Sequence, residues 1–255
     1  MNPMPDLQNL LSRLEAPVRE AGAAIMAIHD RGVDFRSKDD GSPVTIADEQ
    51  AQAILLSALA EIAPEIPVVS EEDPNSHGLK APDTFFLVDP LDGTKEFLKR
   101  DGKGAFTVNV GLIHKGEPVL GIVYAPALNR YFSGAKGFGA SENGKSIECR
   151  CAPKGGQISL VSASHPDDAT QAWLDQQNIA EHRAVGSSLK FTLIAAGEAD
   201  LYARFVPIME WDTAAGDAVV RAAGGSVCNP DGTPFVYGKP GYRNTAFIAR
   251  GKPAT

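Results

Sequence analysis

Residues 85–97 read FFLVDPLDGTKEF, an apolar run that ends abruptly in two acids. The four apolar residues 85–88 predict a buried strand. Pro90 keeps the backbone out of the helical region and removes a hydrogen-bond donor, so we expect an extended turn presenting Asp89 and Asp92 together. Carboxylates this close raise each other's pKa unless a cation neutralises them, and Mg²⁺ prefers oxygen ligands. The stretch therefore predicts a metal site; an acidic surface turn is the alternative interpretation of these residues alone.

Gly93 and Thr94, which follow the second acid, suit contact with an anion. Glycine lets a backbone approach an anion closely, and Thr94 offers a hydroxyl and an N–H at the same point. Groups for an anion therefore lie beside groups for a cation.

Residues 68–73, VVSEED, repeat the pattern of a short apolar strand that ends in acids. If this strand neighbours the one at 85–88, Glu71 and Asp89 converge, and four or five carboxylates share one place. A solvated charge run is the alternative. Upstream, Thr45 followed three residues later by Asp48 resembles a capping box that opens a helix to about residue 63, which explains Asp48 without any further role.

The composition indicates a globular protein with a sizeable core. The chain has 255 residues, 43% of them hydrophobic, and a formal net charge of -8, which argues against general binding to nucleic acid polymers. It contains no apolar run of about 18 residues and no signal-peptide pattern at its start. We expect a soluble, cytoplasmic protein without an integral membrane segment, and peripheral association with the inner membrane stays open. The three cysteines are expected to be ordinary thiols.

The remaining pattern predicts an α+β first half and an α/β second half, with a boundary near residue 153. The first half, 1–153, is expected to contain a helix over 7–30, a surface hairpin or loop over 33–43, a hairpin of strands 107–113 and 119–124, and a continuing meander over 134–144. The second half, 154–255, is expected to contain strands 158–163, 201–203 and 245–249 and helices 168–178, 189–196 and 213–223.

Two motifs in the second half place polar residues before helices. In residues 186–190, GSSLK, the serines are expected to cap a helix whose free N–H groups, with Lys190, favour an anion. In residues 211–217, WDTAAGD, Asp212 is the N-cap candidate of a small-residue helix. Simple capping explains both motifs equally well.

Three of these segments together resemble the signature motifs of the inositol monophosphatase superfamily of Mg²⁺-dependent, lithium-sensitive phosphatases. They are residues 71–72, 89–94 and 211–216, in the family's order and separation. Residues 95–100 and 186–191 resemble the CysQ-like branch, the 3'(2'),5'-bisphosphate nucleotidases. The resemblance implies a five-layered αβαβα sandwich with the site between the two halves: most metal ligands in the first, substrate-binding residues and the last ligand in the second.

The resemblance also implies a set of metal ligands and water-activating residues. Two or three Mg²⁺ ions would be held by four acids and one backbone carbonyl: Glu71, Asp89, Leu91 (carbonyl), Asp92 and Asp212. Thr94 and Asp48 would orient and deprotonate the attacking water, and Glu72 would support a further, loosely held metal. Li⁺ would inhibit, and no covalent phosphoenzyme is implied.

Substrate-binding residues follow from the same comparison. The N–H groups of Gly93 and Thr94 would meet the scissile phosphate, beside Asp212. The nucleotide and its second phosphate would be held by His165, Ser187, Lys190 and Arg204. The stretch 101–104 is longer than expected for the family and is a departure that alters the rim of the site.

The function implied is hydrolysis of the 3'-phosphate of adenosine 3',5'-bisphosphate to AMP and phosphate, and of the corresponding 5'-phosphosulfate. An inositol monophosphatase or a sugar phosphatase is the alternative enzyme, because the metals are shared and only the substrate cradle differs. A non-catalytic module that senses the nucleotide is the alternative outside enzymes. The sequence leaves a monomer and a homodimer equally open.

Overall fold

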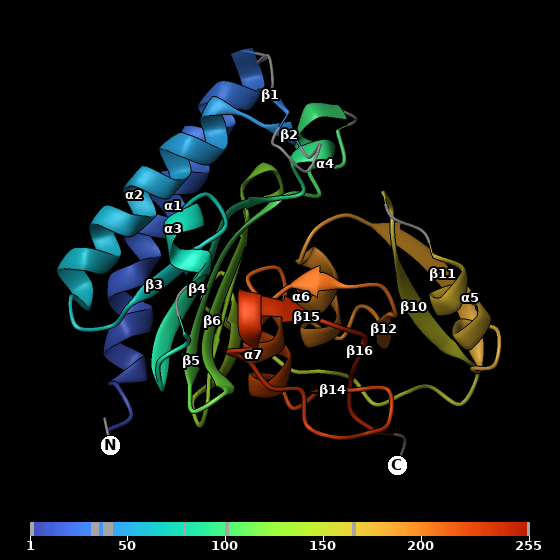
Figure 1. Cartoon of the computed structure of the whole chain (residues 1–255). Helices are drawn as coiled ribbons and strands as arrows, with labels where there is room; N and C mark the ends of the chain where they lie inside the picture. Colours follow the sequence, from blue (N-terminus) through green and yellow to red (C-terminus); the bar gives the residue numbers. More distant parts are fainter. Residues whose placement is uncertain are drawn as a thin grey trace.

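The computed structural model describes residues 3–31, 36–37, 43–78, 80–99, 102–164 and 167–253, with the backbone alone at 36–37 and 43–44. Its elements form five layers (Figure 1). The layers are α1 (Leu7–Arg31) with α2 (Ile46–Ile62), a seven-stranded sheet, α6 (Leu189–Ala195) with α7 (Ala214–Ala222), a five-stranded sheet, and α5 (Asp168–Leu174). The predicted αβαβα sandwich is therefore present.

The seven-stranded sheet is a meander with one parallel strand at its edge. In spatial order its strands are β3 (Val68–Ser70), β4 (Thr84–Asp92), β5 (Thr107–His114), β6 (Glu117–Ala125), β7 (Arg130–Ala135), β8 (Gly139–Glu142) and β9 (Lys145–Ile147). β3 runs parallel to β4 and the remaining pairs are antiparallel. The predicted hairpin and meander are confirmed, and β3 and β4 are neighbours as the acidic strand ends required.

β4 is apolar at consecutive positions because both faces of its sheet are covered. Phe86 and Val88 pack with residues of α1 and α2, whereas Phe85 and Leu87 pack on the side of α6 and α7. Side chains alternate along a strand, so Asp89 continues the face that looks toward α7.

The strand also runs further than predicted. β4 continues to Asp92, with an irregular register between Asp89 and Asp92, instead of ending at residue 88. The backbone around Pro90 is extended, as expected, and Asp92 still pairs with Thr107 of β5. The predicted extended turn is therefore a distorted continuation of the strand.

A row of three glycines lets α7 pack close against this sheet. Gly111, Gly121 and Gly134 are register partners on β5, β6 and β7. A Cβ atom added at Gly121 would lie 2.1 Å from the carbonyl oxygen of Ala215 in α7. At Gly111 and Gly134 it would lie 2.9 Å and 2.8 Å from atoms of the same helix. The row therefore sets the distance between the sheet and the segment that carries Asp212.

The five-stranded sheet has the order β11-β10-β12-β16-β14. Its strands are β10 (Gln157–Ser162), β11 (Ile179–Val185), β12 (Leu201–Arg204), β14 (Ser226–Cys228) and β16 (Phe247–Arg250). β10, β12 and β16 match the predicted strands, whereas β11 and β14 were not predicted. The helix predicted over 168–178 ends at Leu174, and four residues separate it from the start of β11 at Ile179.

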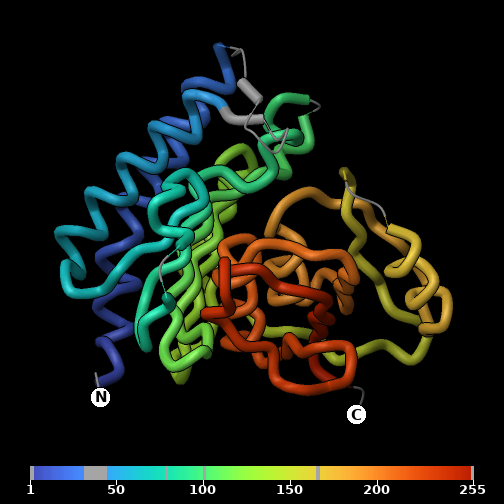
Figure 2. The backbone as a smooth tube through the Cα atoms, viewed as in Figure 1, coloured from blue at the N-terminus to red at the C-terminus, as the bar shows by residue number. Residues whose placement is uncertain are grey.

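The smaller elements complete the chain. They are β1 (Arg36–Ser37), β2 (Pro43–Val44), β13 (Ile208–Met209), β15 (Arg243–Asn244), α3 (Pro74–His77), α4 (Thr94–Lys99) and 3-10 helices at Pro126–Leu128 and Pro240–Tyr242. β1 and β2 pair antiparallel, and the residues between them lie outside the described part of the chain. Figure 2 shows the blue-to-green segments on one side and the yellow-to-red segments on the other, while the boundary near residue 153 stays a prediction.

Two findings concern membranes and cysteines. Within the described residues, no helix combines the length and apolar character that a membrane crossing requires. The thiols of Cys149, Cys151 and Cys228 are free.

Candidate active site

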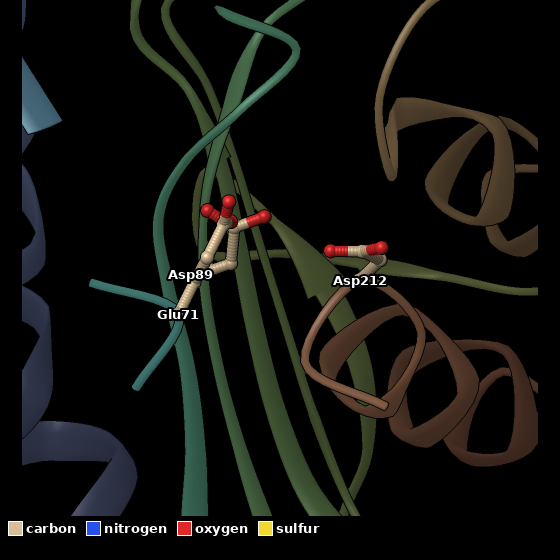
Figure 3. A group of neighbouring side chains, drawn as sticks. All are labelled: Glu71, Asp89 and Asp212. Atoms are coloured by element: carbon tan, nitrogen blue, oxygen red, sulfur yellow. The ribbon is translucent and has the colours of Figure 1, made fainter. Parts of the chain in front are cut away.

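Three acids from distant segments meet between the two sheets. Glu71 directly follows β3, Asp89 lies in β4, and Asp212 lies two residues before α7. One carboxylate oxygen from each lies within 4.8 Å of the others. Figure 3 shows Glu71 and Asp89 side by side on neighbouring strands, with Asp212 facing them from the other half of the molecule. The parallel pairing of Ser70 with Val88 explains why the first two acids are adjacent.

Burial and like charge make this cluster unfavourable when it is fully ionised. Burial raises the pKa of Asp89 well above its usual value, and the charges of Glu71, Asp92 and Asp212 raise it further. Burial, Asp92 and Glu71 raise the pKa of Asp212 in the same way. A divalent cation would remove the repulsion, and three carboxylate oxygens are the donor set that a hard cation such as Mg²⁺ prefers. The residues present therefore fit the predicted metal.

The cluster forms part of the wall of a cavity of about 250 Å³. Most of the predicted ligands and substrate-binding residues line it: Glu71, Asp89, Leu91, Asp92, Gly93, Thr94, Ser187, Lys190, Arg204 and Asp212. Leu91 is held between its neighbours, since its N–H donates to Asp89 Oδ1 (3.0 Å) and its carbonyl oxygen accepts from Thr94 Oγ1 (3.3 Å). Their roles as ligands and binding groups stay predictions.

Two cationic side chains belong to the same cavity. Lys190 is 4% exposed, and its Nζ donates to the carbonyl oxygens of Val185 (3.2 Å) and Ser187 (2.7 Å). Burial lowers the pKa of Lys190 to about 8. Because an ammonium group has three N–H donors, one remains for a ligand. Arg204 Nε is buried and has no hydrogen bond within the described residues. The cavity thus combines groups for a cation with groups for an anion.

Three residues predicted to act at the site lie elsewhere or cannot be placed. Asp48 and Glu72 do not line the cavity in the described part of the chain. Asp48 is buried, and its Oδ2 accepts from the N–H and the Oγ1 hydroxyl of Thr45 (2.8 Å each), so the predicted capping box is confirmed. His165 lies outside the described residues, as does Asp101 at the predicted rim. Roles of Asp48 and Glu72 in water activation stay predictions.

The predicted helix caps are wrong in two places. The N-cap of α7 is Thr213, not Asp212, and the Asp212 carboxylate instead accepts from the N–H of Met209 (3.3 Å). Ser188 occupies the N-cap position of α6, but its side chain makes no capping hydrogen bond; only Ser187 Oγ accepts from the first helical N–H, that of Leu189 (3.2 Å). Neither the Ser188 nor the Asp212 side chain therefore caps the helix that follows it.

Sequence reasoning missed two residues that contact Asp92. Ser188 and Asn109 both donate hydrogen bonds to its Oδ2 atom. Ser188 belongs to a motif already singled out, whereas Asn109 lies within the predicted strand 107–113, where it is a polar residue among apolar ones.

The raised carboxyl pKa values predict that the metal-free protein loses stability as the pH rises. An acid with a higher pKa in the folded state binds more protons when folded, so the free energy of unfolding falls above the usual carboxyl range near pH 4. Bound Mg²⁺ would replace those protons. We therefore expect the melting temperature in EDTA to fall relative to that in Mg²⁺ between about pH 5 and about pH 8.

Asp217 provides an internal reference for this measurement. Burial raises its pKa to about 6, and it pairs with Arg221 away from the cavity. It contributes a slope of the same sign in both buffers, so the difference between the two curves isolates the acid cluster. A difference that stays constant over this pH range would contradict the prediction.

Comparison with known proteins agrees with this geometry. A family model described as "Inositol monophosphatase family" matches residues 6–252. The chain is 45% identical over 225 residues to the 3'(2'),5'-bisphosphate nucleotidase CysQ of Shigella flexneri, covering 86% of this chain and 90% of the relative. It is 43% identical over 241 residues to the protein of that name from Salmonella typhimurium (strain LT2), with 90% and 96% coverage.

A solved structure supports the same assignment. The crystal structure of CysQ from Bacteroides thetaiotaomicron, described as a bacterial member of the inositol monophosphatase family, has a TM-score of 0.79 at 33% identity. The match covers 97% of this chain and 98% of that one. These matches confirm both the mixed α/β fold and the family that the three motifs predicted: the chain belongs to the inositol monophosphatase family.

Proposed function

We propose that this chain is a metal-dependent 3'(2'),5'-bisphosphate nucleotidase that hydrolyses the 3'-phosphate of adenosine 3',5'-bisphosphate to AMP and phosphate. The observation that carries the proposal is that three converging carboxylates line the same cavity as Lys190 and Arg204. This arrangement suits a substrate with two phosphates, because cations held by the carboxylates would bind one phosphate and the side-chain cations would bind the other. The relatives that bear this enzyme's name, at 43–45% identity, support the same choice.

The acids of the cavity are proposed to hold two or three Mg²⁺ ions. Glu71, Asp89, Asp92, Asp212 and the Leu91 carbonyl would supply the ligands. When bound, such ions polarise phosphoryl oxygens and lower the pKa of a coordinated water. Inhibition by Li⁺ and a cytoplasmic location belong to the same proposal.

The groups around the second acid are proposed to bind and orient the reacting phosphate. Gly93 adopts a φ of 90°, a conformation that glycine tolerates, and its N–H with that of Thr94 would bind the scissile phosphate. Thr94 and Asp48 would orient the attacking water and accept its proton. As the water oxygen bonds to phosphorus, the bond to the 3' oxygen breaks and that oxygen takes up a proton.

Selection of the nucleotide is assigned to the groups of the site that are not acidic. Lys190 and Arg204 would bind the second phosphate, and Ser187 and His165 would complete the contacts to the nucleotide. A sulfate on the 5'-phosphate adds charge at the same end, so adenosine 3'-phosphate 5'-phosphosulfate is proposed as a second substrate.

Lys190→Ala should raise KM for adenosine 3',5'-bisphosphate by about 10- to 100-fold, because a hydrogen bond to a charged group contributes about 1.5–3 kcal/mol. A simple phosphate monoester lacks the second phosphate, so its KM should change much less. Lys136→Ala removes the same charge from an exposed residue outside the cavity and is the matched control. Equal increases in KM for both substrates would remove Lys190 from the second-phosphate site.

Phosphate release from adenosine 3',5'-bisphosphate, inositol 1-phosphate and fructose 1,6-bisphosphate, measured side by side with Mg²⁺, tests the proposed function. We expect the highest kcat/KM for the nucleotide. Faster turnover of inositol 1-phosphate or fructose 1,6-bisphosphate would identify an inositol monophosphatase or a sugar phosphatase instead. Nucleotide binding without phosphate release would identify a sensing module.

A further inference from the structure

One oxygen of the Asp92 carboxylate is surrounded by hydrogen-bond donors. Asp92 Oδ2 accepts from the N–H of Ser188 (2.5 Å), from Ser188 Oγ (2.6 Å) and from Asn109 Nδ2 (3.3 Å). A carboxylate has about four lone-pair sites over its two oxygens, so the two N–H donors already fill Oδ2, and the Ser188 hydroxyl lies against the same atom. Only Oδ1 remains for a ligand. Asp92 is also absent from the group of three acids whose oxygens already converge, although it lines the same cavity.

Asn109 is placed by strand register. It lies opposite Asp89 in the β4–β5 pair and is fully buried. Its Nδ2 also donates to Ser188 Oγ (3.0 Å), so the amide nitrogen bridges the serine and the carboxylate. Turning the amide over would set its oxygen against those two oxygens, and this fixes its orientation. Its own Oδ1 has no partner within the described residues, an arrangement that costs stability and indicates a role beyond packing.

Ser188 joins Asp92 to the segment that carries Asp212. It is 2% exposed, and its Oγ lies 2.7 Å from the backbone carbonyl oxygen of Asp212. Its single hydroxyl proton therefore lies between acceptors on β4 and on the loop before α7. The preceding residue, Ser187, has a φ of 49°, an uncommon conformation for a residue other than glycine.

We infer that Ser188 and Asn109 are positioning residues for Asp92: they hold Oδ2 so that the carboxylate presents only Oδ1 to the metal site. The inference rests on the proposed function, since it requires a cation in the cavity. Groups that orient a metal ligand typically change metal affinity by about 10- to 100-fold when they are removed. The effect should therefore be visible in metal binding itself, without substrate.

Ser188→Ala tests this inference, with Thr192→Val as the matched control. Thr192 is a fully buried hydroxyl residue of the same helix, but its Oγ1 donates to the carbonyl oxygen of Leu189 within α6. Mg²⁺ affinity is measured by calorimetric titration, and the melting temperature is measured in EDTA. We expect Ser188→Ala to raise the Kd for Mg²⁺ by about 10-fold or more relative to Thr192→Val. The two variants should melt at similar temperatures in EDTA.

Asn109→Ala keeps the measurement decisive if Ser188→Ala does not fold. Because its hydrogen bond to Asp92 is longer, we expect an increase in Kd of about 3-fold, in the same direction. If the folded variants bind Mg²⁺ with the same affinity as the wild-type protein, this inference is overturned while the proposed function stands. A wild-type protein that binds no Mg²⁺ would overturn the proposed function and this inference together.

Discussion

Asp89→Asn is expected to lower kcat/KM by about 1,000-fold or more while leaving the fold intact. The loss should exceed the 10- to 100-fold typical of residues that only support a ligand, because Asp89 supplies a carboxylate oxygen to the cluster itself. The fold should survive because an asparagine oxygen can still accept the hydrogen bond from the N–H of Leu91.

Thermal unfolding separates this loss of a ligand from a loss of structure. In EDTA, Asp89→Asn should melt at the wild-type temperature or above it, because one of several repelling buried charges is gone. The stabilisation that Mg²⁺ gives the wild type should largely disappear. Asp175→Asn, a change at an exposed carboxylate, should alter neither property. Retained activity, or a lower melting temperature in EDTA, would contradict the role of Asp89 as a ligand of the cation.

Gly121→Ala should destabilise the protein by about 3 kcal/mol or more, at the upper end of the cost of overpacking. The added Cβ would lie 2.1 Å from the carbonyl oxygen of Ala215, a backbone atom that moves only with α7. For a chain of this size we expect the melting temperature to fall by roughly 6–12 °C. Because α7 begins two residues after Asp212, affinity for Mg²⁺ should fall as well.

Gly155→Ala is the matched control, since a Cβ atom there would have no heavy atom within 4 Å. It should leave both the melting temperature and the Mg²⁺ affinity near their wild-type values. If Gly121→Ala behaves like this control, the glycine row does not set the distance between α7 and the sheet.

The meeting of Glu71 and Asp89 could be predicted from the sequence because each acid follows a short apolar run. Residues 68–69 and 85–88 read as core; Asp89 follows the second run directly, and Glu71 follows the first after one serine. Neighbouring parallel strands end at the same edge of a sheet, and β3 and β4 are parallel neighbours. Local pattern and long-range pairing therefore agree at this point.

The cap predicted at Asp212 was wrong because a turn precedes the helix. The N–H groups of Thr213 and Ala214 both bond to the carbonyl oxygen of Glu210. This shifts the start of α7 beyond Asp212 and leaves its carboxylate in the cavity. The motif drew attention to a residue that lies in the acid cluster, but capping rules gave the wrong local structure for it.

Contacts that depend on register or on distant pairing could not be predicted. Asn109 lies at the site only because the strand register places it opposite Asp89. Ser188 donates to a carboxylate 96 residues away in the sequence. The edge strand β11 was missed because its residues 180–184 are exposed, so no alternation of apolar and polar residues marks it.

Crystals soaked with Mn²⁺ test the central claim most directly, because the anomalous signal of this Mg²⁺ substitute locates the ion without reference to activity. We expect a peak between the carboxylates of Glu71, Asp89 and Asp212, with direct contacts to their oxygens. Crystals in which Mn²⁺ binds only elsewhere, or in which these three side chains point away from one another, would contradict it.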